Sequence, residues 1–135
     1  MRGVTFDSNI YISALVFGGE CGRLVRMARA REFQLVVSEV ILREVITVLR
    51  EDFHWEPYRL QDARQRMLSI ARVVMPALTI QVIGEDPDDD RILECAVAGE
   101  SEFLITRDKD LLRLVTYEGI MIVTPTQFLT QFMEP

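Results

Sequence analysis

Short apolar runs alternate with helical segments along almost the whole chain, and this alternation constrains the fold most strongly. The strand-like runs are GVTF (3–6), FQLVVS (33–38), LTIQVI (78–83), EFLIT (102–106) and GIMIV (119–123). They are rich in β-branched and aromatic residues, and helical spacing fills the stretches between them. Strands that alternate with helices form right-handed crossover units. The pattern therefore predicts an α/β fold with a mostly parallel sheet covered by helices on both faces.

The predicted helices have recognisable first and last residues. Ser38 and the pair Thr124–Pro125 are typical N-terminal signals, and glycines follow two of the segments. The expected helices cover residues 8–17, 20–31, 39–52, a long stretch from Pro57 to near Pro76, 90–99, 108–114, and a final helix that carries Phe128 and Phe132.

Length and composition indicate one globular unit. The chain has 135 residues, of which 49% are hydrophobic, so we expect a single domain over residues 1–135. No apolar run approaches the roughly 18 residues of a membrane span, and the N-terminus begins with a strand pattern instead of a leader. We therefore expect a cytoplasmic protein that does not interact with a membrane.

Few residues are available for histidine or cysteine chemistry. His54 is the only histidine, and Cys21 and Cys95 are too few for a zinc cluster or a disulfide framework. The net charge of −6 does not favour nucleic-acid binding through the overall field. Arginines that cluster in residues 23–31 and 59–72 could contact phosphates, although solvated helix faces are the more common role for such residues.

Carboxylates from separate segments are expected at one edge of the sheet. Asp7 follows the first strand and Asp108 follows FLIT, and the carboxyl ends of parallel strands meet at the edge where ligands bind. The run GEDPDDD then opens a helix that leaves the same edge, with acids at Glu85, Asp86, Asp88, Asp89 and Asp90. One or two acids can be explained by a helix dipole, but five cannot.

Glu44 is the fourth candidate. On a helical wheel it lies at the border of the apolar arc, where a carboxylate without a partner is unfavourable. Glu51 shares nearly the same meridian but lies two turns further from the sheet edge. Asn9 and Thr106 are small polar residues at that edge, where helix capping and hydrogen bonding to a metal site are both open. Asp7 and Asp108 could likewise be N-cap residues.

Several carboxylates in one cleft repel one another, and a divalent cation removes this repulsion. Mg²⁺ and Mn²⁺ prefer oxygen ligands, and they bind carboxylates, waters and substrate phosphates together. A metal of this kind supports phosphodiester hydrolysis without a histidine. The number of ions is open.

The sequence resembles the PIN domain family, in particular the toxin components of toxin-antitoxin pairs. Four stretches carry the resemblance in family order: VTFDSNIYISAL, SEVILREVITVL, DPDDDRILECAVAG and FLITRDKDLL. The resemblance implies a three-layer α/β/α sandwich, Mg²⁺- or Mn²⁺-dependent cleavage of RNA, frequent homodimers, and a cognate antitoxin that blocks the site. The residues implied for metal binding and catalysis are Asp7, Glu44, Asp89 and Asp108. Asp90 is a close second to Asp89.

Two other functions fit parts of the pattern. A phosphatase could form an aspartyl-phosphate on Asp7, but it would need a second aspartate where this chain has Asn9, and Lys109 is the only lysine. A binding module without catalytic activity could instead use the acids as caps and surface charge. A rise in melting temperature with Mn²⁺ is expected of a metal enzyme and not of this binding module. The nuclease and the phosphatase differ in substrate, since the first cleaves RNA and the second releases phosphate from a small ester.

Overall fold

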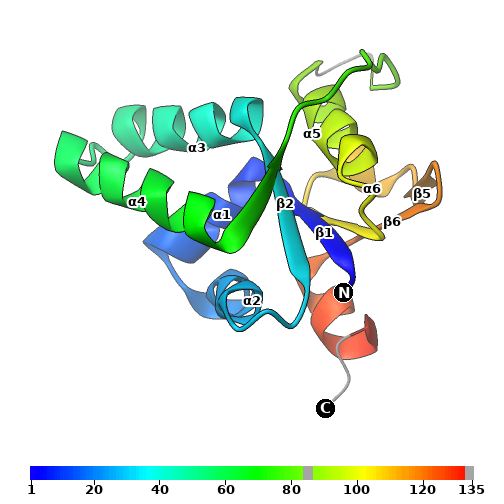
Figure 1. Ribbon diagram of the computed structural model, residues 1–135, viewed down its shortest axis with the longest axis horizontal. Coiled ribbons are helices and arrows are strands. Elements are labelled where there is room, and N and C mark those ends of the chain that lie inside the picture. The colour runs from blue at the N-terminus through cyan, green and yellow to red at the C-terminus, as the bar shows by residue number, and fades with distance from the viewer. Residues whose placement is uncertain (84–86, 133–135) are drawn as a thin grey trace.

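The computed structural model describes residues 1–83 and 87–132, and Figure 1 shows a central sheet with helices on both sides. The six strands lie in the order β3-β2-β1-β4-β6-β5, and all neighbours are parallel except β5 and β6. Their bounds are β1 Gly3–Phe6, β2 Gln34–Ser38, β3 Ala71–Val74, β4 Phe103–Ile105, β5 Thr116–Tyr117 and β6 Ile120–Val123. The expected α/β fold with a mostly parallel sheet is confirmed.

The helices form the two outer layers of the sandwich. Helix α5 lies on one side of the sheet, and α1, α2 and α4 lie on the other (Figure 1). The bounds are α1 Ser8–Val16, α2 Gly19–Arg29, α3 Glu39–Glu51, α4 Pro57–Ile70, α5 Pro87–Ala98, α6 Lys109–Leu112 and α7 Pro125–Gln127, followed by the π-helical turn η1 Phe128–Phe132. The predicted caps at Ser38 and Thr124 are confirmed, since both side chains accept a backbone hydrogen bond from the first turn.

Alternation of side chains along the strands divides the core between the two faces. On one face, Phe6 packs against Tyr11 of α1 and against Phe33, with ring centroids 5.3 and 6.0 Å apart. On the other face, the Thr5 hydroxyl is hydrogen-bonded to that of Ser101, just beyond α5. Each central strand therefore packs against helices on both sides, as expected for a parallel sheet.

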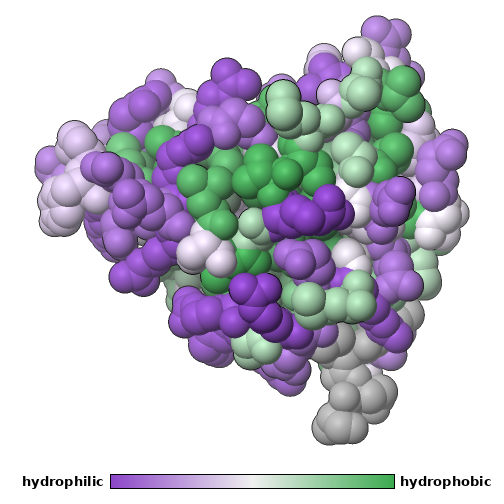
Figure 2. Space-filling model, viewed as in Figure 1, coloured by the Kyte–Doolittle hydropathy of each residue, from purple (hydrophilic) through white to green (hydrophobic). Residues whose placement is uncertain are grey.

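The predicted long helix from Pro57 to near Pro76 is wrong in its last part. Helix α4 ends at Ile70, and the next four residues form β3, which pairs with β2 from Leu35↔Ala71 to Ser38↔Val74. Residues such as Val73 and Val74 are β-branched, and pairing with an open sheet edge outweighs continuation of the helix. Strand β3 is the front edge of the sheet in Figure 1, and apolar side chains gather on the same face in Figure 2.

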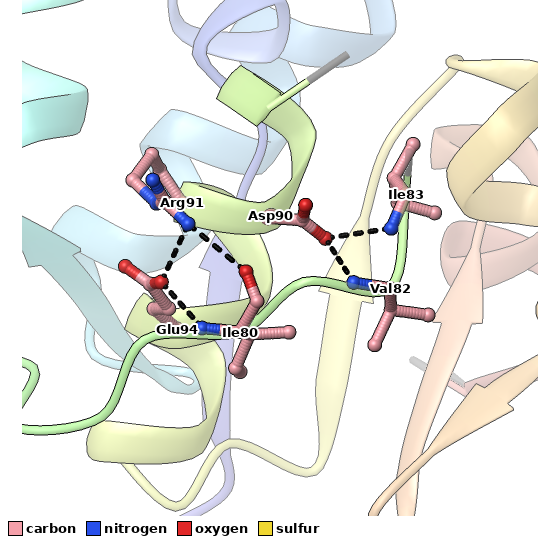
Figure 3. A network of polar contacts seen from close by, with 6 residues as sticks. All are labelled: Ile80, Val82, Ile83, Asp90, Arg91 and Glu94. Atoms are coloured by element: carbon pink, nitrogen blue, oxygen red, sulfur yellow. Dashed lines mark hydrogen bonds and ion pairs between the residues drawn. The ribbon is translucent and has the colours of Figure 1, made fainter. Parts of the chain in front are cut away.

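The predicted strand LTIQVI is also wrong, because residues 78–83 pair with no strand of the described structure. The N–H groups of Val82 and Ile83 donate to one carboxylate oxygen of Asp90, at 3.0 and 2.8 Å (Figure 3). The N–H of Ile80 donates in the same way to Glu94, at 2.8 Å. Side chains of α5 thus occupy backbone donors that a neighbouring strand would otherwise use.

Sequence analysis also missed the two-residue strand β5, which forms a short hairpin with β6. Of the predicted acidic run, Glu85 and Asp86 lie outside the described residues. In the part of the chain that is described, no helix combines the length and the apolar character needed to cross a membrane.

Candidate active site

Asp7 and Thr106 lie side by side at the carboxyl edge of the sheet. Strands β1 and β4 are parallel neighbours with Phe6 opposite Ile105, so the next residues of both strands also meet. The N–H of Asp7 donates to the carbonyl of Ile105 at 3.0 Å, and the Thr106 hydroxyl donates to Oδ2 of Asp7 at 2.7 Å. The strand register therefore orients the first predicted acid.

Asp7 is only 5% exposed, and its surroundings affect the protonation of its carboxyl group. Burial raises the pKa of Asp7 above its ordinary value, the hydrogen bond from Thr106 opposes that rise, and the negative charge of Asp108 adds to it. Asp7 occupies the N-cap position of α1 without a side-chain capping bond. Its oxygens instead accept from Thr106 and, at 3.3 Å, from the Ser8 hydroxyl.

Asp108 is the N-cap residue of α6, and capping was one of the two roles predicted for it. Its Oδ1 accepts from the N–H groups of Asp110 and Leu111 at the start of α6. Its own N–H donates to the Thr106 hydroxyl at 2.9 Å. Both capping bonds use the same oxygen, so capping and binding of a cation through Oδ2 are compatible.

Three aspartates converge beside this edge. One carboxylate oxygen from each of Asp89, Asp108 and Asp110 lies within 4.8 Å of the other two. Asp89 is in the first turn of α5 and is 7% exposed, whereas Asp108 and Asp110 are half-buried around the start of α6. The Thr106 hydroxyl contacts both the carboxylate of Asp7 and the N–H of Asp108, so the first acid lies next to the same cluster.

Asp110 was missed by sequence analysis, which treated it only as part of a short helix. Its position in TRDKDLL, two residues after Asp108, could have identified it as a candidate. Acids in the first turn of a helix lie close together at the same end of that helix. Asp110 also forms an ion pair with Arg113 at 3.2 Å.

Asp90 lies in a different environment from Asp89. It is 4% exposed, and its Oδ1 accepts the N–H groups of Val82 and Ile83 (Figure 3). It does not belong to the three-aspartate cluster. The sequence left open whether Asp89 or Asp90 is the third acid of the site. The geometry places Asp89 in the cluster, whereas Asp90 binds the backbone of residues 82 and 83.

The remaining predicted residues, Glu44 and Asn9, lie outside the cluster. Glu44 is half-buried on α3, which follows β2, the other neighbour of β1. Helix α3 packs against both α1 and α5. Asn9 is exposed in the first turn of α1.

Comparisons with known proteins identify the family and the fold. Residues 3–110 match the family model described as PIN domain, and the chain belongs to this family. No curated protein matches the sequence. The chain is also similar to a crystal structure of VapBC2 from Rickettsia felis bound to a DNA fragment from their promoter, with 15% identity and a TM-score of 0.65. The similarity covers 91% of this chain and 98% of that one, and at this identity it supports the fold alone.

Proposed function

We propose that this protein is a metal-dependent endoribonuclease that hydrolyses RNA phosphodiester bonds. The observation that carries the proposal is the convergence of Asp89, Asp108 and Asp110 at the carboxyl edge of a PIN-domain sheet. Ligands of α/β sheets bind at this edge. The described residues around the cluster include no histidine, so the chemistry rests on carboxylates.

The donor set fits Mg²⁺ or Mn²⁺. All donors are carboxylate oxygens, which these ions prefer over softer ligands. An ion with ligand distances of about 2.1 Å holds opposite ligands about 4.2 Å apart. The three carboxylate oxygens lie within 4.8 Å of one another, so they would move closer together by side-chain adjustment to bind one ion. We propose Asp7, Glu44, Asp89 and Asp108 as the metal and catalytic residues, with Asp110 as an additional ligand.

A bound metal would supply an activated water and neutralise charge on the scissile phosphate. The protein side chains have separate tasks. The Thr106 hydroxyl fixes the orientation of Asp7, and it also accepts from the backbone of Asp108, so one side chain connects two acids. Such supporting hydrogen bonds hold ligands in the geometry that the reaction needs.

A polyanionic substrate is compatible with the chain's acidity only if cations lie near the site. Arg107 stands between Thr106 and Asp108, and its side chain is half exposed. Its ion pair with Glu20 is long, at 3.8 Å. We propose that Arg107 contacts a phosphate next to the cleaved bond, because an arginine can bind two phosphate oxygens at once.

The test is cleavage of a mixed RNA pool by purified protein with Mn²⁺, with and without EDTA. Asp7→Asn and Asp89→Asn should each abolish cleavage. Asp88→Asn is the matched control, because Asp88 lies in the same acidic run but is exposed and outside the cluster. RNA fragments with 5′-phosphate ends support the nuclease, and release of inorganic phosphate from a small ester would support the phosphatase. Equal cleavage by the wild type and Asp7→Asn would contradict the proposal.

We further propose that the protein is the toxin of a toxin-antitoxin pair and that a cognate antitoxin blocks its site. The motif resemblance and the fold similarity to VapBC2 support this role. Expression in a bacterial host should slow growth, and Asp89→Asn at the same expression level should not. Growth arrest that persists in Asp89→Asn would argue against arrest by RNA cleavage.

A further inference from the structure

A pocket of about 260 Å³ lies between helices α1, α2 and α4. Most of its lining comes in pairs of residues four apart, which are Tyr11 and Leu15 on α1, Val25 and Arg29 on α2, and Arg66 and Ile70 on α4. Residues four apart lie on the same face of a helix, so one face of each helix is turned toward this space. None of the acids of the proposed metal site lines the pocket, so what it binds can be considered without the nuclease activity.

The packing of α4 leaves this space open. Helices α1 and α2 pack closely against each other, whereas α4 packs mainly against α3 and β3. All three lining helices lie on the same side of the sheet (Figure 1). The side chains of Leu15, Val25 and Ile70 are only half-buried, so the pocket offers apolar surface to a molecule that enters from solvent.

The Tyr11 hydroxyl adds a polar group to this apolar lining. Tyr11 is 1% exposed, and its hydroxyl has no hydrogen-bond partner among the described residues. Burial raises the pKa of Tyr11 well above its ordinary value of 10.0, so the hydroxyl keeps its proton and can donate it to an acceptor. Buried polar groups are nearly always hydrogen-bonded, which favours a ligand that carries an acceptor.

Two arginines also line the pocket, in a chain whose net charge is −6. Arg29 and Arg66 are both exposed, so their charges lie where the pocket meets solvent. Arg66 forms an ion pair with Asp62 at 3.0 Å, but both side chains are largely exposed, and such a pair is weak. A guanidinium has five N–H donors, so Arg66 can keep this contact and bind a second carboxylate. The exposed end of the pocket therefore favours an anionic group.

We propose that this pocket binds a small hydroxyaryl carboxylate, whose carboxylate contacts Arg29 and Arg66 and whose hydroxyl accepts a hydrogen bond from Tyr11. The aromatic ring lies against the apolar side chains of the three helices. A ring is favoured over a flexible chain because it loses less rotational freedom when it binds. A carboxylate without a second polar group would leave the Tyr11 hydroxyl unpaired.

The volume of the pocket limits the ligand to one ring with short substituents. At about 30 Å³ for each water-sized group, the pocket holds about nine such groups. Pockets for drug-sized ligands are larger, at about 300–1,000 Å³. The substance para-hydroxyphenylacetate has a suitable size and carries its hydroxyl and its carboxylate at opposite ends, so it is the probe for this site.

A titration of the isotope-labelled protein with para-hydroxyphenylacetate, followed by NMR in the presence of EDTA, tests the proposal. The dissociation constant should be about 0.1–1 mM, as expected of a ligand of about ten non-hydrogen atoms. Arg29→Met and Arg66→Met should each weaken binding about fivefold or more. Arg26→Met is the matched control, because Arg26 is also exposed in the last turn of α2 but does not line the pocket.

A comparison with phenylacetate, which lacks the hydroxyl, tests the role of Tyr11. The wild type should bind para-hydroxyphenylacetate about five- to tenfold more tightly than phenylacetate, and Tyr11→Phe should bind the two equally. Tyr11→Phe should melt no earlier than the wild type, because the hydroxyl that it removes has no hydrogen-bond partner among the described residues. A hydroxyl preference that persists in Tyr11→Phe would overturn the orientation of the ligand. Absence of saturable binding, or binding that Arg29→Met and Arg66→Met leave unchanged, would overturn the proposal.

Discussion

Replacing Asp90 by alanine should lower the stability of the protein while preserving its response to a divalent metal. The Asp90 carboxylate accepts the N–H groups of Val82 and Ile83, at 3.0 and 2.8 Å, and it holds residues 80–83 against α5 together with Glu94. Hydrogen bonds to a charged group contribute about 1.5–3 kcal/mol each. Val82 is 43% exposed, so water can replace one partner, whereas Ile83 is 8% exposed and its N–H would lose its acceptor.

These contacts give an expected loss of about 2–4 kcal/mol in the free energy of unfolding for Asp90→Ala. For a chain of this length, that corresponds to a fall of about 10 °C in melting temperature. Asp88→Ala is the control for the loss of a negative charge in the first turn of α5, which is worth about 0.3–1 kcal/mol. Asp88 is exposed in the same turn, so the difference between the two variants gives the added cost of removing the buried acid that holds residues 82 and 83.

The assay is a thermal melt of each variant with EDTA and again with excess Mn²⁺. Asp90→Ala should melt early under both conditions and keep the rise that Mn²⁺ produces in the wild type. Asp89→Ala should lose that rise, because it removes a carboxylate from the cluster with Asp108 and Asp110. If Asp90→Ala also loses the Mn²⁺ response while Asp89→Ala keeps it, the assignment of the two acids is reversed.

Three further predictions follow from other contacts. Thr106→Val removes the buried hydroxyl that donates to Asp7 and accepts from the N–H of Asp108, so it should lower the free energy of unfolding by about 1–3 kcal/mol. In the folded variant RNA cleavage should fall about 10- to 100-fold, whereas an unchanged rate would separate Thr106 from the site. Gly99→Ala should destabilise the protein by about 1–3 kcal/mol in a denaturant titration, because the added Cβ would lie 2.3 Å from a methyl group of Val36. Burial raises the pKa of the Cys95 thiol from 9.0 to about 12. The folded protein therefore favours the neutral thiol, and the stability that this preference contributes is fully present below pH 9 and is lost as pH rises toward 12. Cys95→Ala should therefore flatten the alkaline decline in unfolding free energy, by up to about 4 kcal/mol, and an identical decline in both proteins would refute this origin.

Much of the fold could be predicted because helix and strand periods differ and because caps and glycines mark the ends of elements. The errors concern two β-branched segments that compete for one place beside β2. Residues 71–74 take that place, and residues 78–83 do not, although the second segment looks more like a strand. The outcome depends on Asp90 and Glu94, which bind the backbone of the second segment from a helix that follows it in sequence. Local patterns do not contain this tertiary contact.

The position of Asp7 and Asp108 at the sheet edge could be predicted, because both follow strands that alternate with helices. The register that brings Asp7 to Thr106 could not, since it depends on which strands are neighbours. Asp110 was overlooked because the start of α6 is set by the cap at Asp108, and only the folded turn brings the two carboxylates together.

The division of tasks within the acidic run follows from helix geometry. Successive residues of a helix differ by about 100° in direction, whereas residues four apart differ by about 40°. Asp90 and Glu94 therefore share one side of α5, and both hold residues 80–83, with Arg91 bridging Glu94 and the carbonyl of Ile80 (Figure 3). Asp89 is turned away from that side, toward Asp108 and Asp110. Residues 80–83 pack on the side of α5 that carries Asp90 and Glu94. The carboxylate at position 89 is therefore the one that points toward the sheet edge. Asp89→Ala, which keeps the acid at position 88 one residue away, should therefore lose the rise in melting temperature that Mn²⁺ produces in the wild type.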